Sequence, residues 1–376
     1  MSVYSALRPL LFRLSAESAH HAGMRAGRIG QRLGPITRGL FRPRLSEADR
    51  TALRSRVMGL EFECPVGIAA GLDKNAELIP LWNQIGAGFC EVGSVSARPS
   101  DGNPKPRAFR LPDDGALINR MGLNNHGAER VARRIGDLRR PKGFPIGINI
   151  AKTHDPSILG QAGIDDFVES TRHLLPHGDF VVINVSCPNT AEGKTFEDPE
   201  ALAPLVRAVA TERDRQAALP GRSSVPLLVK LSPPPAVDFD TGPVDELIAL
   251  SLECGAAGFV ATNTASDRQG LQTAPAKLAS IGKGGLSGRP VRERSLALVK
   301  HLRRRLEGSA PIIGVGGIDS VESAYDRVVS GADLIEIYTG LVFEGPGLVG
   351  KIAKGLVKAA QADGFESVAA AVGSRV

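Results

Sequence analysis

The sequence has few aromatic residues, few cysteines and no long uncharged run. Aromatic side chains make up 5% of the 376 residues, with a single tryptophan. No stretch of 18 residues is free of charge, so we expect no membrane-spanning helix, which needs about 20 mainly apolar residues. The cysteines form no C-x-x-C pair, which argues against a zinc site, an iron–sulfur cluster or a disulfide framework. We therefore expect no bound metal and a reducing compartment; the cysteines are Cys64, Cys90, Cys187 and Cys254.

Positive charge is concentrated at the N-terminal end. Residues 1–56 hold eleven arginines, no lysine and three acidic residues, whereas the rest of the chain has two more acidic than basic side chains. Apolar residues recur at helical spacing within 3–14 and within 19–33. Arginine-rich amphipathic helices can lie on an anionic membrane surface. The alternatives are a helical cap on the main domain, a targeting presequence or a nucleic-acid-binding arm.

Short apolar runs alternate with helical patterns from residue 65 onward, which is typical of βα units around a parallel sheet. The predicted strands are 66–70, 88–92, 145–150, 180–185, 227–231, 258–262, 311–315 and 334–337. The predicted helices are 77–85, 125–135, 165–175, 199–217, 244–254, 291–306, 321–329 and 347–360. Eight parallel strands close naturally into a barrel. We expect an α/β protein with a (β/α)8 TIM barrel at 57–376 and an amphipathic helical, membrane-associating extension at 1–56.

Polar residues stand at the predicted carboxyl ends of these strands, where the active site of such a barrel lies. Lys74 and Lys230 could hold a carboxylate or an electron-rich ring, although each alone would more often be a solvated charge. Gly316 and Gly317 fall at the usual phosphate site of the barrel, although such a turn can also be a simple connection. Cys187 could be a reactive thiol or a small buried apolar residue. The pattern predicts a site for a polar, planar ligand.

Ordered motifs resemble those of the dihydroorotate dehydrogenase family over nearly the whole chain. They are AAGLDKNAE at 69–77, GNPKPRAFRLP at 102–112, NRMGLNN at 119–125, SCPNT at 186–190, VKLSP at 229–233, ATNT at 261–264, GGLSGRP at 284–290, IIGVGGI at 312–318 and YTGLVFEGPGL at 338–348. RPLLFRL at 8–14 with AHH at 19–21 is similar to the membrane-associated, quinone-dependent class of this family.

The resemblance implies an FMN-containing barrel that oxidises dihydroorotate to orotate in de novo pyrimidine biosynthesis. It implies that the flavin is held by Ala70, Gly71, Leu72, Asp73, Lys74, Ser94, Asn149, Asn184, Lys230, Thr262, Gly288, Gly317, Tyr338 and Thr339. It implies that the substrate is held by Lys74, Asn119, Arg120, Met121, Gly122, Leu123, Asn184, Asn189, Asn263 and Thr264. Amide side chains can satisfy the N–H and C=O groups of a pyrimidine ring. By the same resemblance, Cys187 is the catalytic base.

Cys187 departs from the quinone-dependent class, which usually has serine at this position. A thiol, with a reference pKa of about 8.5, remains a competent base. The loop at 193–199 is also more similar to the soluble classes, which use fumarate or NAD as the electron acceptor. We favour the quinone interpretation because the soluble classes lack an extension like 1–56. The alternatives are a soluble-type dihydroorotate dehydrogenase and a non-enzymatic, membrane-surface flavin-binding protein.

The quinone interpretation also implies partners and a location. Ubiquinone or menaquinone would take the electrons through the N-terminal helices, which would bind the membrane surface. We expect a monomer that binds no nucleic acid. It would be a peripheral protein on the cytoplasmic face of a bacterial inner membrane, in preference to the mitochondrial inner membrane, because no long presequence precedes the RPLLFRL motif.

We predict that the variant Cys187→Ala retains bound flavin but loses nearly all dihydroorotate oxidation, because it has no base for the substrate proton. The measurement is anaerobic stopped-flow absorbance of the flavin after dihydroorotate is added. Flavin reduction at close to the wild-type rate would show that another group is the base.

Overall fold

The computed structural model describes residues 3–185 and 196–376, and its centre is a closed barrel of parallel strands. The strand order around the barrel is β10-β12-β13-β3-β4-β7-β8-β9. All eight predicted strands are present in it, so the predicted (β/α)8 barrel is confirmed. They are β3 (Val66–Ile68), β4 (Phe89–Val95), β7 (Ile146–Ile150), β8 (Phe180–Asn184), β9 (Leu227–Leu231), β10 (Gly258–Ala261), β12 (Ile312–Val315) and β13 (Leu334–Ile337).

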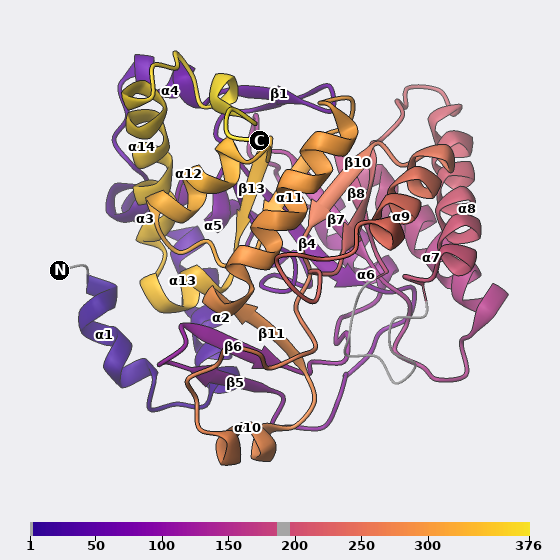
Figure 1. The fold of residues 1–376 in the computed structure, drawn as a ribbon, viewed down its shortest axis with the longest axis horizontal. Helices are drawn as coiled ribbons and strands as arrows, with labels where there is room; N and C mark the ends of the chain where they lie inside the picture. Colours follow the sequence, from indigo (N-terminus) through magenta and orange to yellow (C-terminus); the bar gives the residue numbers. More distant parts are fainter. Residues whose placement is uncertain (1–2, 186–195) are drawn as a thin grey trace.

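Helices surround the barrel on the outside (Figure 1). Each of the predicted helices is present, and two of them, α8 and α12, begin with a side-chain cap. Asp198 accepts a hydrogen bond from the Glu200 N–H ahead of α8, and Ser320 with Ser323 forms a capping box at α12. The predicted helices correspond to α5 (Ile79–Gln84), α6 (Ala128–Gly136), α7 (Gly160–Leu174), α8 (Pro199–Ala217), α9 (Gly242–Glu253), α11 (Arg292–Leu306), α12 (Val321–Val329) and α14 (Gly347–Ala362).

Aromatic side chains fill the amino-terminal half of the barrel. The ring of Phe89 lies 5.4 Å from that of Phe62 and 6.2 Å from that of Phe180. Gly67 makes room for this packing, since a Cβ there would lie 2.3 Å from the Phe89 ring. The hairpin of β1 (Ser55–Val57) and β2 (Leu60–Phe62) carries Phe62 to this end. Because these aromatic rings fill the amino-terminal half of the barrel interior, polar side chains have space only in the carboxyl-terminal half.

A second, antiparallel sheet was not predicted. It has the order β11-β6-β5 and consists of β5 (Ala108–Leu111), β6 (Ala116–Asn119) and β11 (Gly285–Gly288). Its strands interrupt the βα repeat after β4 and after β10, and α10 (Pro275–Ile281) lies next to it (Figure 1). The buried Asp114 accepts hydrogen bonds from the backbone of Gln272 and from Thr273, which ties the two insertions together.

Four helices occupy the N-terminal segment: α1 (Val3–Leu11), α2 (Ala16–Arg32), α3 (Gly34–Phe41) and α4 (Glu47–Leu53). The first two match the predicted helical segments, whereas α3 and α4 were not predicted. α2 packs on α5 and β5, α1 packs on α13 (Thr339–Glu344), and α4 packs on α14. The division of the chain at residue 56 stays a prediction. Within 3–185 and 196–376, none of the helices is long and apolar enough to span a membrane.

Candidate active site

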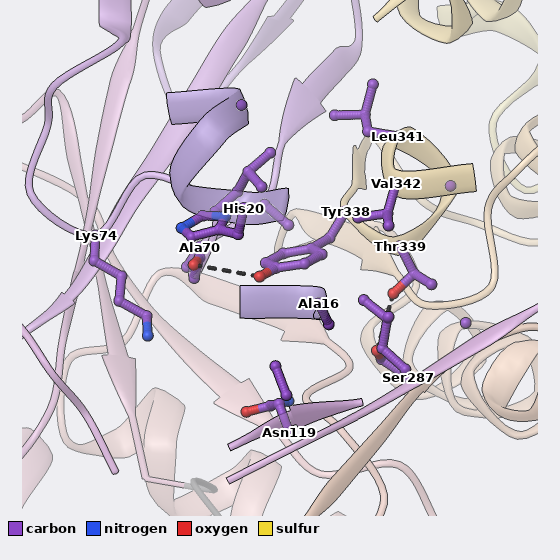
Figure 2. A pocket seen from close by; sticks show the side chains of 18 of the residues that line it. Ala16, His20, Ala70, Lys74, Asn119, Ser287, Tyr338, Thr339, Leu341 and Val342 are labelled. Carbon is purple, nitrogen blue, oxygen red and sulfur yellow. Dashed lines mark hydrogen bonds between the residues drawn. The ribbon is translucent and has the colours of Figure 1, made fainter. Parts of the chain in front are cut away.

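A cavity of about 760 Å³ opens at the carboxyl ends of the barrel strands and extends between α1, α2 and the small sheet. Most of the residues predicted to bind flavin or substrate line it. They are Ala70, Gly71, Leu72, Lys74, Ser94, Asn119, Met121, Gly122, Leu123, Asn184, Lys230, Thr262, Asn263, Thr264, Gly288, Gly317, Tyr338 and Thr339. Figure 2 shows Lys74, Asn119 and Tyr338 around one space, with His20 of α2 above them.

Among the predicted residues that the structure describes, three do not line the cavity. Asp73 is buried behind it and accepts hydrogen bonds from the N–H groups of Glu77 and Leu78, where it positions the start of α5. Arg120 points away, because it donates to the Ile281 carbonyl and lies over the Phe109 ring. Asn149 lies beneath the cavity wall and is fully buried. Cys187 and Asn189 lie outside the described residues, and the roles of all the predicted site residues stay predictions.

The floor of the cavity carries a buried charge cluster, which we call the floor cluster: Glu91, Asn149, Lys230 and Glu336. The Lys230 ammonium lies 3.1 Å from Oε1 of Glu91, and the Asn149 amide donates to the same oxygen at 2.6 Å. Burial alone would lower the pKa of Lys230, but the charges of Glu91 and Glu336 outweigh it and raise the pKa. Lys230 is therefore a cation at neutral pH, as the predicted ligand-binding role requires.

The rim of the cavity is a hydrogen-bonded row of amides and hydroxyls. The Asn263 side chain donates to the side-chain oxygen Oδ1 of Asn184 at 3.1 Å, and the Asn184 side chain donates to the Ser94 hydroxyl at 2.8 Å. Across the opening, the Lys74 ammonium contacts Oδ1 of Asn124 at 2.6 Å. Because each amide is fixed by its neighbour, the row presents donors and acceptors in set positions, which suits a flat polar ring.

The glycine turn after β12 lies against the other side of the cavity. Gly316 has φ 117° and Gly317 has φ 69°, conformations that favour glycine. A Cβ on Gly317 would lie 2.5 Å from the Arg292 side chain, and one on Gly288 would lie 2.4 Å from the Gly115 carbonyl oxygen. Both positions therefore require glycine because neighbouring protein atoms leave no room for a side chain. The turn lies where such barrels usually bind phosphate.

Arg327 supports this turn from below. It is 0% exposed and donates to the Gly316 carbonyl at 2.7 Å and to the Ser295 hydroxyl at 3.1 Å. Burial lowers its pKa to about 9, so it stays protonated at neutral pH. The sequence analysis missed Arg327, because an arginine within a helix pattern is usually a surface residue.

An apolar arm of the cavity runs between α1 and α2, lined by Leu7, Leu11, Ala19, Met24 and other apolar side chains. Arg110 of β5 borders the arm, where it lies 4.5 Å from the Phe12 ring centroid and donates to the carbonyls of Leu11 and Leu14. Burial, with the nearby Lys74 and His21, lowers the pKa of His20 to about 4. His20 is therefore neutral at neutral pH. The AHH motif pointed to His20 only through the family resemblance, and Arg110 was missed.

An ion pair attaches α2 to the segment just before β5 of the small sheet. Glu17 of α2 accepts from the Arg107 guanidinium at 3.0 Å, and both side chains are about nine-tenths buried. Burial would raise the pKa of Glu17, but the hydrogen bond and charge of Arg107, with Lys105 and His21, outweigh it and lower the pKa. The position of α2, which forms one wall of the apolar arm, thus depends on the Glu17–Arg107 ion pair.

Comparisons with known proteins agree with this geometry. The family model "Dihydroorotate dehydrogenase" matches residues 52–359. A Nocardia farcinica protein named dihydroorotate dehydrogenase (quinone) is 43% identical, covering 99% of this chain and 97% of its own. A Rhodococcus opacus protein of the same name is 42% identical and covers 99% of each. A crystal structure of Eimeria tenella DHODH in complex with ferulenol is similar with a TM-score of 0.83, at 29% identity and 98% coverage of both chains.

We predict that Glu17→Gln destabilises the protein by about 1–3 kcal/mol at neutral pH, because Arg107 loses a charged acceptor. The folded-state pKa of Glu17 lies below its ordinary value of 4.5. Its contribution is therefore present above pH 4.5 and is lost as the pH falls through the folded-state pKa. Thermal unfolding of both proteins across this range is the measurement, with Glu47→Gln at an exposed ion pair as the control. A difference that persists at low pH would contradict this account.

Proposed function

The chain belongs to the dihydroorotate dehydrogenase family, and we propose that it oxidises dihydroorotate to orotate with a flavin, passes the electrons to a membrane quinone, and so serves de novo pyrimidine biosynthesis. One observation carries the proposal. The polar rim at the barrel mouth and the apolar arm between α1 and α2 are parts of a single cavity. A polar pyrimidine and an apolar quinone could therefore both reach one cofactor held between them.

The family is flavin-dependent, and the described residues fit FMN. Gly288, Gly316 and Gly317 line the cavity beside Thr339, and the glycine turn follows strand β12, in the region where this kind of barrel usually binds phosphate. Next to Lys230 at the cavity floor, the buried Oδ1 of Asn149 has no hydrogen-bond partner among the described residues, so this acceptor is unsatisfied in the structure. Lys230 would lie under the polar ring end, and Thr339 with Ser287, 2.9 Å apart, would border the phosphate. Bound FMN supplies hydride acceptance from the substrate.

The residues of the chain would bind the substrate and remove its proton. Lys74 supplies positive charge for the orotate carboxylate, and the Asn184 and Asn263 amides match the ring N–H and C=O groups. Cys187 would accept the C5 proton as the C6 hydride leaves. That residue lies outside the described ranges, so its role rests on the family resemblance.

Ubiquinone or menaquinone would enter through the apolar arm. A neutral His20 can donate to or accept from a quinone oxygen without an ionic partner, and Arg110 borders the same space. The alternative is a soluble-type enzyme with fumarate or NAD as the electron acceptor, and it is supported by the resemblance of Cys187 to the soluble classes. The apolar lining of the arm favours a quinone over either polar acceptor.

We also propose that α1–α3 bind the membrane surface at the cytoplasmic face of a bacterial inner membrane, and that the protein acts as a monomer. Large apolar side chains on these helices and in the turns between them are exposed to solvent among the N-terminal arginines, as in membrane-surface helices. They are Leu7, Leu10, Leu14, Ile29, Leu33, Ile36 and Leu40, with exposed fractions from 46% to 68%.

We predict that dihydroorotate bleaches the flavin anaerobically, and that decylubiquinone restores its colour while fumarate and NAD do not. The reason is that the acceptor must enter an apolar arm. Stopped-flow absorbance follows both half-reactions. Recovery with fumarate alone would move the protein to the soluble class, and absence of bleaching would refute the proposed substrate.

We predict that the double variant Leu10→Ser, Leu40→Ser binds anionic phospholipid vesicles roughly tenfold or more weakly, because two apolar side chains no longer enter the lipid. Vesicle co-sedimentation measures the change. The matched control is Leu159→Ser, Leu219→Ser, which alters exposed leucines away from the N-terminal helices. Equal losses in both variants would argue against a docking face on α1–α3.

A further inference from the structure

The floor cluster contains two carboxyl groups and one ammonium group. Glu91 and Glu336 are each 1% exposed, and Lys230 is 5% exposed. They come from β4, β13 and β9, so barrel closure brings them together from distant parts of the chain. Glu336 also lines the cavity, beside Lys230.

Hydrogen bonding distinguishes the two acids. Oε1 of Glu91 accepts from both Lys230 and Asn149. Oε2 of Glu91 and both oxygens of Glu336 have no donor among the described residues, although the two carboxyl groups are close enough to hydrogen-bond to each other. Two carboxylates only accept, so they cannot form that bond. A single proton between them supplies the missing donor.

Charge gives the same answer. Two carboxylates and one ammonium would leave a net negative charge in a buried space, which is strongly unfavourable without a further partner. One proton turns the cluster into a neutral acid beside a neutral ion pair. Since Glu91 already has two donors, it is the carboxylate, and Glu336 is the acid.

We propose that Glu336 carries a proton at neutral pH and donates it in a hydrogen bond to Glu91, as a positioning residue that holds Glu91 against Lys230. Electrostatics supports the assignment: burial, followed by the charge of Glu91, raises the pKa of Glu336 well above its ordinary value, and Lys230 offsets only part of this. The Cys90 thiol of β4 also interacts electrostatically with Glu336. Burial raises the pKa of this thiol well above its ordinary value, so the thiol stays neutral and adds no charge.

The consequence for catalysis rests on the proposed function. A flavin that accepts electrons gains negative charge, which a negative floor would oppose and a neutral floor would not. Because Glu336 is neutral, the positive charge of Lys230 is balanced by the single negative charge of Glu91, and the floor cluster has no net charge. The cluster can then hold a polar ring without disfavouring its reduced form.

Infrared spectroscopy tests the proton directly, with or without flavin. Wild-type protein containing 13C-labelled glutamate should show the carbonyl stretch of a buried, protonated carboxylic acid at neutral pH. The band should vanish in Glu336→Gln and persist in Glu129→Gln, which alters an exposed acid. A wild-type spectrum without this band would overturn the proposal, and that measurement needs no variant to fold.

Glu91→Gln tests whether the two acids share the proton. With the Glu91 charge removed, Glu336 is the remaining acid of the floor cluster beside Lys230 and should ionise, so the band should vanish here as well. If Glu336 stayed protonated in Glu91→Gln, burial alone would account for its proton. That result would overturn the claim that the two acids share one proton.

The midpoint potential of bound flavin provides a separate test. Glu336→Gln should leave it unchanged, because a neutral amide replaces a neutral acid of the same shape. A higher potential in this variant would show that it removed a negative charge, and would overturn the proposal. A protein that bound no flavin or did not oxidise dihydroorotate would contradict the proposed function and leave the infrared result standing.

Discussion

Closure of the barrel is the constraint on which the rest of the site depends. β10 pairs with both β9 and β12, and β13 pairs with β3, so the carboxyl ends of all eight strands surround one opening. Phenylalanine side chains fill the other half of the interior. Polar groups from distant strands therefore have to share a small volume, where each charge needs a partner. The contacts among Glu91, Asn149 and Lys230 are the direct result.

The sequence predicted the strands well because buried parallel strands are nearly continuous apolar runs bounded by turns. Residues at the ends of those runs, such as Lys74 and Asn184, could be placed at the cavity for the same reason. Periodicity could not place Asp73 or Arg120, because the direction of a side chain beyond a strand end depends on contacts with distant elements. The small sheet escaped prediction because β11 pairs with β6 across more than 150 residues, and a short strand carries little pattern. Glu91 and Glu336 left a visible signal, a charge inside an apolar run, whose meaning required the folded barrel.

Two chemically different regions line the cavity. The barrel supplies fixed charges and amides, while the N-terminal helices supply an apolar wall that the barrel lacks. Their junction is polar: Glu17 pairs with Arg107, and Arg110 binds the carbonyls between α1 and α2. Directional bonds can fix the angle of a helix where apolar contact alone would let it slide, and such precision matters for a wall that borders a ligand.

Helix α1 is attached to the last part of the barrel. The Tyr4 hydroxyl donates to the Val342 carbonyl at 2.6 Å, and Arg8 donates to the Phe343 carbonyl at 3.0 Å. Tyr4 is thus synthesised 338 residues before Val342, and ribosomes add only about 5–20 residues per second. For many seconds the nascent chain has an amphipathic N-terminal segment without its barrel. The cavity wall, and with it any enclosed cofactor site, can be completed only after residue 343 has left the ribosome.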